Sequence, residues 1–191
     1  MNLTVIILNH LPKKQLEPTL KSISFADQVI VIYNSEPLKN FAKQRNLALS
    51  KAKTDWVLFV DSDEIVSKKL AQEIKQAIKS LKFKGYLIPR QDVISGQTLK
   101  YGETGSVKIL RLAKKNSGKF SRSVHETWEI KGRVGELKNP LIHVKNNFIF
   151  EFIKRIGQYG PIDSLSLTQE GKPFTYFRLL LNPPAKFFLN Y

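Results

Sequence analysis

The chain of 191 residues is predicted to be an α/β protein, with a mostly parallel central sheet covered by helices on both faces. Three short apolar runs carry this prediction, because each is nearly continuous and rich in β-branched or aromatic residues: 3–8, 29–33 and 56–60. A segment with helical spacing follows each run. The resulting order of strand, helix, strand, helix, strand and helix is typical of a parallel sheet.

The helices are predicted from the spacing of their apolar residues. The first follows a break at 9–12 and places Leu16, Leu20 and Ile23 on one face. The second is predicted over 41–52, where Phe, Leu and Ala recur. The third begins after Ser67, the predicted N-cap, and its apolar residues recur at i, i+4, i+8 and i+11: Leu70, Ile74, Ile78 and Leu81.

The second half of the chain has a different pattern. Residues 85–89 predict a fourth strand, whereas 90–145 contain only short strand-like pieces such as 107–112, several glycines and many cations. Helical spacing resumes at 147–159. We therefore divide the chain into a domain at 1–145, with halves at 1–89 and 90–145, and a helical, apolar tail at 146–191.

Composition excludes several classes of protein. The absence of cysteine excludes a disulfide scaffold, a thiolate zinc site and a cysteine nucleophile. No apolar run approaches the roughly 20 residues of a membrane-spanning helix, and the start lacks the features of a signal peptide, so we expect a cytoplasmic protein.

The positive charge is concentrated in the second part of the chain. Residues 1–64 hold 8 basic and 7 acidic residues, whereas 65–191 hold 23 basic and 9 acidic ones. This asymmetry indicates an anionic partner: nucleic acid, a phosphorylated ligand or anionic lipid. Charge alone does not choose among them.

An acidic cluster follows the third strand directly. Asp61, Asp63 and Glu64 come after the run 56–60, and ligands of open α/β sheets bind beyond the carboxyl ends of the strands. Carboxylates at i and i+2 suit Mg²⁺ or Mn²⁺, which keep other positions for water and substrate phosphates. The alternative is an acidic turn that caps the next helix. The buried strand before it and the basic second half favour the metal site.

The same residues carry a resemblance to a known family. The segment WVLFVDSDE at 56–64, preceded by RNLAL at 45–49, resembles family 2 glycosyltransferases, and more narrowly small bacterial enzymes of the lipopolysaccharide-core β-glucosyltransferase type. The similarity covers nearly the whole chain in order, since it continues at 85–90, 109–112, 121–126, 141–143 and 184–188. It implies a GT-A fold, a nucleotide-sugar donor, a divalent metal and inversion at the anomeric carbon.

Two features depart from the family pattern. The aspartate with which the family contacts the base is missing from 32–37, so the base stays open, although a UDP-sugar is the first expectation. Family members also run on past the position of Tyr191. Within the family pattern, 1–89 is the nucleotide-binding half and 90–145 the acceptor and catalytic half.

The resemblance also implies the metal and donor ligands. Asp63 is expected to bind Mn²⁺ or Mg²⁺, and Asp61 to contact the donor ribose, or the metal through water. His143 corresponds to a late histidine that serves as a third metal ligand, but a satisfied core histidine explains its apolar surroundings equally well. Both alternatives stay open.

The remaining candidates concern acid–base chemistry and phosphate binding. By the same resemblance, Glu126 in the segment RSVHE at 122–126 is expected to deprotonate the acceptor hydroxyl; the alternative is a surface glutamate beside a core-packed histidine. Arg111 and Arg122 are expected to bind the diphosphate. Arg45 either reaches the nucleotide or lies on the surface. Lys114, Lys115 and Lys119 are expected to form a solvated face or a patch that steers an anionic acceptor.

The apolar tail admits two functions. The stretch 174–181 favours packing on the core or on a second subunit, and 187–191 favours a membrane interface. The leading hypothesis is an inverting, metal-dependent transferase that moves a hexose to a cell-envelope glycan or glycolipid. The alternatives are a catalytically degenerate GT-A protein and a basic nucleic-acid-binding module. The second is disfavoured because the aromatics lie in apolar runs, without a helix-turn-helix or zinc pattern.

Overall fold

A computed structural model describes residues 2–9, 12–33, 41–101, 105, 107–121 and 127–145, together with parts of 153–190 that include all of 175–190. Its strands are β1 (Leu3–Asn9), β2 (Gln28–Tyr33), β3 (Trp56–Asp61), β4 (Glu64–Val66), β5 (Gly85–Ile94), β6 (Gln97–Thr98), β7 (Lys108–Lys114), β8 (Gly118–Ser121), β9 (Thr127–Ile130), β10 (Val134–Glu136) and β11 (Leu141–Lys145). Its longer helices are α1 (Glu17–Ser22), α2 (Phe41–Lys51), α3 (Lys68–Ala77) and α5 (Tyr176–Asn190).

The main sheet has the strand order β2-β1-β3-β7-β5-β11-β4. Strands β2, β1 and β3 are parallel, as the three apolar runs predict. Strand β7 then enters antiparallel to both β3 and β5, and β11 runs parallel to β5 and antiparallel to β4. The predicted α/β fold class is confirmed.

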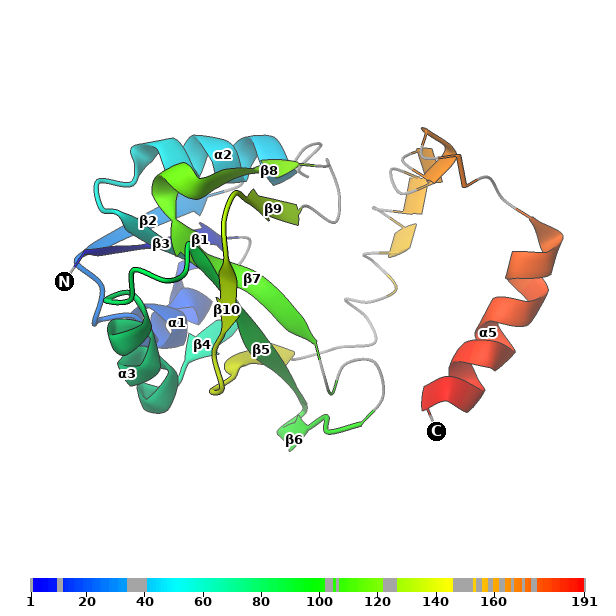
Figure 1. The fold of residues 1–191 in the computed structure, drawn as a ribbon. Coiled ribbons are helices and arrows are strands. Elements are labelled where there is room, and N and C mark those ends of the chain that lie inside the picture. Colours follow the sequence, from blue (N-terminus) through cyan, green and yellow to red (C-terminus); the bar gives the residue numbers. More distant parts are fainter. Residues whose placement is uncertain are drawn as a thin grey trace.

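Helices cover both faces of this sheet (Figure 1). On one face, Ile23 at the C-cap of α1 and Leu70 and Ile74 of α3 pack against alternate residues of β1 and β3. On the other face, α2 and the hairpin of β8 and β9 pack against Phe59 and its neighbours. This alternation follows from the two-residue period of a strand, which sends successive side chains to opposite faces.

The β8–β9 hairpin is anchored to α2 and to the sheet. The side chain of Asn46 donates to the Phe120 carbonyl at 2.9 Å and accepts from the Phe120 amide at 2.8 Å. Phe120 stacks on Trp128 with ring centroids 4.8 Å apart, and both rings meet Phe59 edge-on. The hairpin therefore holds a fixed position over the end of β3.

Two predicted boundaries differ from the structure. Ser67 caps α3 as predicted, with its hydroxyl accepting from the Leu70 amide at 3.2 Å. The helix nevertheless ends at Ala77, where Tyr86 donates its hydroxyl to the Ala77 carbonyl, and Leu81 lies exposed beyond it. Strand β5 continues five residues past the predicted end at Pro89, because β11 pairs in parallel with residues 90–94.

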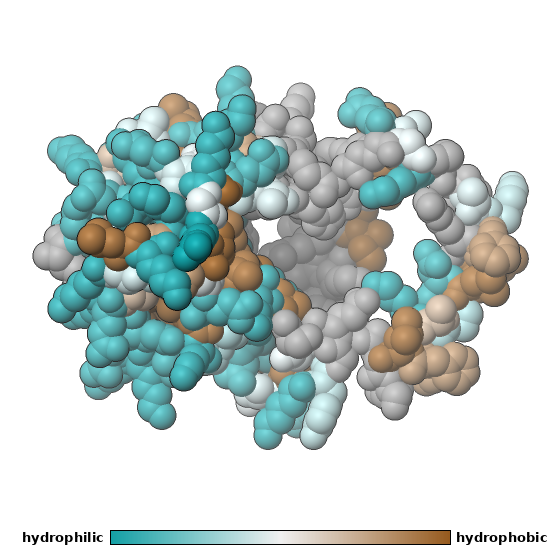
Figure 2. Space-filling view, in the orientation of Figure 1, coloured by the Kyte–Doolittle hydropathy of each residue, from teal (hydrophilic) through white to brown (hydrophobic). Residues whose placement is uncertain are grey.

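The tail ends in α5, which contains Pro183 and Pro184. Its described apolar side chains are exposed, up to 84% for Leu189, and Figure 2 shows hydrophobic side chains in brown on this helix. The described part of 174–181 is exposed and does not pack on the core. Contact of this stretch with a second subunit stays a prediction. Among the described helices, none is both long and apolar enough to cross a membrane.

Candidate active site

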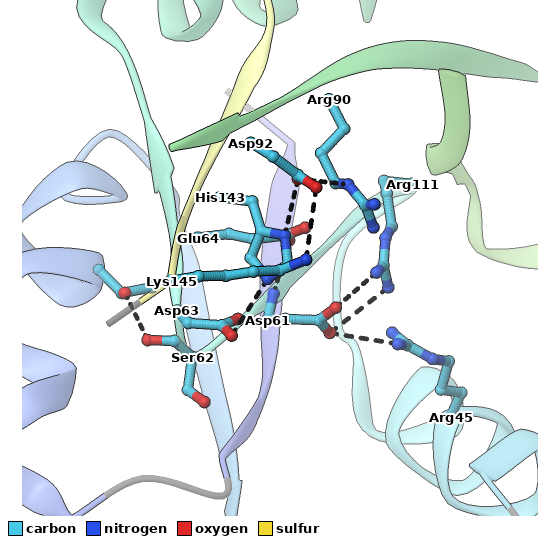
Figure 3. A network of polar contacts seen from close by, with 11 residues as sticks. Arg45, Asp61, Ser62, Asp63, Glu64, Arg90, Asp92, Arg111, His143 and Lys145 are labelled. Atoms are coloured by element: carbon cyan, nitrogen blue, oxygen red, sulfur yellow. Dashed lines mark hydrogen bonds and ion pairs between the residues drawn. The ribbon is translucent and has the colours of Figure 1, made fainter. Parts of the chain in front are cut away.

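The polar side chains gather where β3 ends and β4 begins (Figure 3). The short turn between these strands is held from two sides: Thr19 donates its hydroxyl to the Ser62 carbonyl at 2.9 Å, and the Val144 amide donates to the Asp63 carbonyl at 2.9 Å. The contacts tie the turn to α1 and to β11. The carboxylates of Asp61 and Asp63 are thus carried by a fixed backbone.

Asp61 is paired with two arginines. Arg111 on β7 places Nη2 at 2.5 Å from Oδ2, and Arg45 on α2 places Nη2 at 3.2 Å from Oδ1. Burial raises the pKa of Asp61, but the two guanidinium groups outweigh it and hold that pKa well below its usual range. The carboxylate is therefore ionised at neutral pH, and its side chain stays 27% exposed toward the site.

Arg45 is buried, so the alternative prediction that it lies on the surface is wrong. It is 3% exposed, and its guanidinium carbon lies 5.2 Å from the ring centroid of Phe59 and 5.6 Å from that of Phe120. These distances place the cation over two aromatic faces beneath Asp61. Arg45 connects the aromatic cluster of the hairpin with the acidic strand end.

Glu64 braces the turn. Its buried carboxylate accepts the Asp61 amide at 2.8 Å. Burial raises the pKa of Glu64 to about 7, and the neighbouring charge of Asp61 acts in the same direction. With 1% of its surface exposed, Glu64 has no access to a substrate hydroxyl.

Asp63 forms a chain of contacts with His143 and Asp92. His143 Nε2 lies 3.1 Å from Asp63 Oδ2, and His143 Nδ1 lies 2.9 Å from Asp92 Oδ1. Burial lowers the pKa of His143, but the carboxylates of Asp63 and Asp92 outweigh it and raise that pKa. His143 is buried beside the acidic turn with a partner at each ring nitrogen, so the metal ligand and the satisfied core histidine both stay open.

Asp92 is a site residue that the sequence analysis missed. It is buried on β5, and Arg90 Nε and Lys145 Nζ lie 3.1 and 3.4 Å from its oxygens. Burial raises the pKa of Asp92, but His143 and the two cations outweigh it and lower that pKa. The available signal was the two-residue period of β5, which puts Asp92 on the same face as Ile88 and Arg90.

The donor atoms suit a divalent cation only in part. No three His, Asp or Glu side chains of the described residues converge into a complete cage. Asp63 and His143 already lie side by side, and Asp61 turns both oxygens to arginines. Two protein ligands suffice for Mg²⁺ or Mn²⁺ when substrate phosphates and water complete the shell. Asp63 and His143 fit such a site.

Two predicted site residues lie outside the described residues. Glu126 and Arg122 belong to the segment 122–126, which joins β8 to β9 in the sequence. Their roles stay predictions.

Three lysines between residues 108 and 115 contact other parts of the protein. Lys115 donates to the carbonyls of Ser50 and Ala52 at the end of α2, and the Lys114 ammonium lies over the Trp56 ring. Lys108 pairs with Glu136 at 2.5 Å. Lys114 and Lys115 therefore contact other parts of the protein, and the predictions of a purely solvated face and of a free steering patch do not fit these two residues.

Comparison with known proteins agrees with this arrangement. The family model "Glycosyl transferase family 2" matches residues 1–137. The lipopolysaccharide core biosynthesis glycosyltransferase LpsC of Rhizobium meliloti is 24% identical over 160 residues, which are 82% of this chain and 59% of that relative. An uncharacterized glycosyltransferase of Rickettsia typhi is 24% identical over 157 residues, 75% of this chain and 54% of the relative. The chain thus spans somewhat more than half the length of these relatives.

Solved structures with a similar fold include TarS of S. aureus. TarS residues 1–349 in complex with UDP-GlcNAc superpose with a TM-score of 0.54 at 17% identity, covering 77% of this chain and 59% of that one. The complex with UDP gives a TM-score of 0.54 at 16% identity, with coverages of 82% and 64%. These likenesses show the GT-A fold. The family match over most of the chain establishes that the chain belongs to glycosyltransferase family 2.

Proposed function

We propose that this chain is the donor-binding and catalytic part of an inverting, metal-dependent glycosyltransferase. It moves a hexose from a nucleotide-diphospho-sugar to a glycan or glycolipid of the cell envelope. One observation carries the proposal: in a family 2 domain, the end of β3 places an Asp63–His143 pair beside an Asp61–Arg111 pair. A cation-binding carboxylate next to a fixed guanidinium is the chemistry that a diphosphate needs.

The donor is proposed to be a UDP-sugar, with support from TarS, whose solved complexes contain UDP-GlcNAc and UDP. Arg111 would bind the diphosphate, since its five donors allow it to serve Asp61 and a phosphate together. Asp61 would accept from the ribose or from metal-bound water. Arg45 would act from below by holding the Asp61 carboxylate toward the donor.

A divalent cation, when bound, would neutralise the charge that grows on the leaving diphosphate. Asp63 and His143 would hold it. The turn contacts of Ser62 and Asp63 with α1 and β11 keep both side chains in place without help from the substrate. The protein would therefore not need to rearrange its backbone for the reaction.

The chemical step would use Glu126 as general base. The acceptor oxygen bonds to the anomeric carbon while the bond from that carbon to the diphosphate oxygen breaks. The diphosphate leaves with the electron pair, and the Glu126 carboxylate takes the hydroxyl proton. Attack opposite to the leaving group inverts the anomeric carbon.

An envelope acceptor is proposed because the name of LpsC places that relative in lipopolysaccharide core biosynthesis. The exposed apolar side chains of α5 suit a peripheral contact with the membrane that would carry a lipid-linked acceptor. We propose a cytoplasmic location, with peripheral contact at the inner face of the cell membrane.

Calorimetric titration with a panel of nucleoside diphosphates, with and without Mn²⁺, tests the proposal. We expect one nucleotide to bind only with Mn²⁺, and the binding to be lost in Asp63→Ala. Asp55→Ala is the matched control, because Asp55 is an exposed carboxylate just before the opposite end of the same strand. Failure of every nucleotide to bind the folded protein would contradict the proposal. Binding without sugar transfer to any acceptor would favour the degenerate alternative.

A further inference from the structure

Asp92 and His143 are neighbours in the sheet itself. Strands β5 and β11 pair in parallel with Asp92 and His143 in direct register, and the two side chains meet at 2.9 Å (Figure 3). On the other side of β11, His143 is in register with Glu64 of β4. The ladder, rather than a loop, therefore sets the distance between the carboxylate and the imidazole.

The buried carboxylate of Asp92 depends on donors from the protein. It is 1% exposed, so water has little access to it; Lys145 and the Nδ1 side of His143 are its hydrogen-bond partners, and Arg90 is an ion-pair partner at 3.1 Å. A buried acceptor that loses a donor is left with an uncompensated desolvation cost. Asp63, on the opposite side of the ring, is 15% exposed and within reach of water.

We propose that Asp92 is a positioning residue: it keeps the proton of the neutral His143 imidazole on Nδ1 and so turns an unprotonated Nε2 toward Asp63. The proposal rests on the proposed function, in which a cation sits beside Asp63. An imidazole binds a cation through an unprotonated nitrogen, and a hydrogen bond at the other nitrogen fixes the orientation of the ring. Asp92 would thus prepare a metal ligand that it does not itself join.

The tautomer of His143 tests this inference without any metal. The chain has three histidines, so long-range ¹H–¹⁵N correlation at a pH where all are neutral gives three patterns, and His143→Gln assigns one of them. We expect His143 to carry its proton on Nδ1, whereas free histidine favours Nε2. Asp92→Ala should move the proton to Nε2. A wild-type proton on Nε2 would overturn the proposal.

The conservative variant separates positioning from charge. In Asp92→Asn, an amide oxygen at the Oδ1 position still accepts from His143 Nδ1, whereas the negative charge that faces Arg90 and Lys145 is lost. We expect Asp92→Asn to keep the Nδ1 proton. A proton on Nε2 in this variant would contradict the proposal and indicate that only the negative charge matters.

Cation affinity gives the second measurement. In titrations with Mn²⁺ and UDP, Asp92→Ala should weaken Mn²⁺ about 10- to 100-fold, whereas Asp92→Asn should stay near the wild type. Glu73→Gln is the matched control, because the Glu73 carboxylate is likewise held by hydrogen bonds, three of them from Lys138 and Asn139, but away from the site. An equal loss in Glu73→Gln would reduce Asp92 to a structural residue. Absence of Mn²⁺ binding to the wild type would contradict the proposed function, while the metal-free tautomer would still decide the role of Asp92.

Discussion

Asn46 connects the hairpin of β8 and β9 to helix α2, and its replacement by alanine is expected to destabilise the protein. The change removes two hydrogen bonds, of 2.9 and 2.8 Å, and leaves the Phe120 amide and carbonyl without those partners in a partly buried position. At about 1 kcal/mol for each bond, plus part of the desolvation cost, we expect a loss of about 2–3 kcal/mol. The hairpin strands also flank the segment that contains Glu126, so activity should fall with it.

Urea unfolding followed by tryptophan fluorescence measures this loss, because Trp128 of the hairpin stacks on Phe120. Ser50→Ala is the control on the same helix. Its exposed hydroxyl bonds only locally to the Leu47 carbonyl, so we expect a change below about 0.5 kcal/mol. Equal stabilities of the two variants would refute the idea that Asn46 anchors the hairpin.

Three further substitutions test contacts elsewhere in the protein. Gly118→Ala should unfold the hairpin or lower stability by about 3 kcal/mol or more in thermal melts, because the new Cβ would lie 1.8 Å from the Glu129 carbonyl oxygen; a wild-type melting curve would contradict the close strand approach. Arg45→Met should lower stability by about 2–4 kcal/mol in urea unfolding, since it removes a buried partner of Asp61; no loss would mean that Arg111 alone compensates Asp61. Burial raises the pKa of Glu73, but the hydrogen bonds from Asn139 and Lys138 outweigh it, so the folded pKa lies below the ordinary value of 4.5. Glu73→Gln should therefore cost about 1–2 kcal/mol at pH 7, and its difference from the wild type should shrink as the pH falls from about 4.5 through the lower folded pKa; a difference independent of pH would contradict this.

The first half of the fold could be predicted because its signals are local. Near-continuous apolar runs and helical spacing each involve neighbours in the sequence, and they placed β1, β2, β3 and the start of α3. The insertion of β7 between β3 and β5 is a long-range pairing, which no periodicity of 107–112 encodes. The length of β5 was underestimated for the same reason, since its last residues pair with β11, some fifty positions later.

The site could be predicted where its residues directly follow a strand in the sequence. Asp61 and Asp63 could be placed at a ligand-binding edge from the run before them, and the structure brings Arg111 and His143 to that edge. The burial of Arg45 could not be predicted, because it depends on aromatic rings from β3 and β8. Asp92 was missed because its role arises only from the register of two strands.

The position of Mn²⁺ and UDP on the crystalline protein tests the proposed donor site most directly, with manganese located through its anomalous scattering. We expect one manganese ion bound by Asp63 and His143 Nε2, with the diphosphate on its other side within hydrogen-bonding distance of Arg111. Manganese or nucleotide bound elsewhere, with the contact between Asp63 and His143 intact, would contradict this proposal.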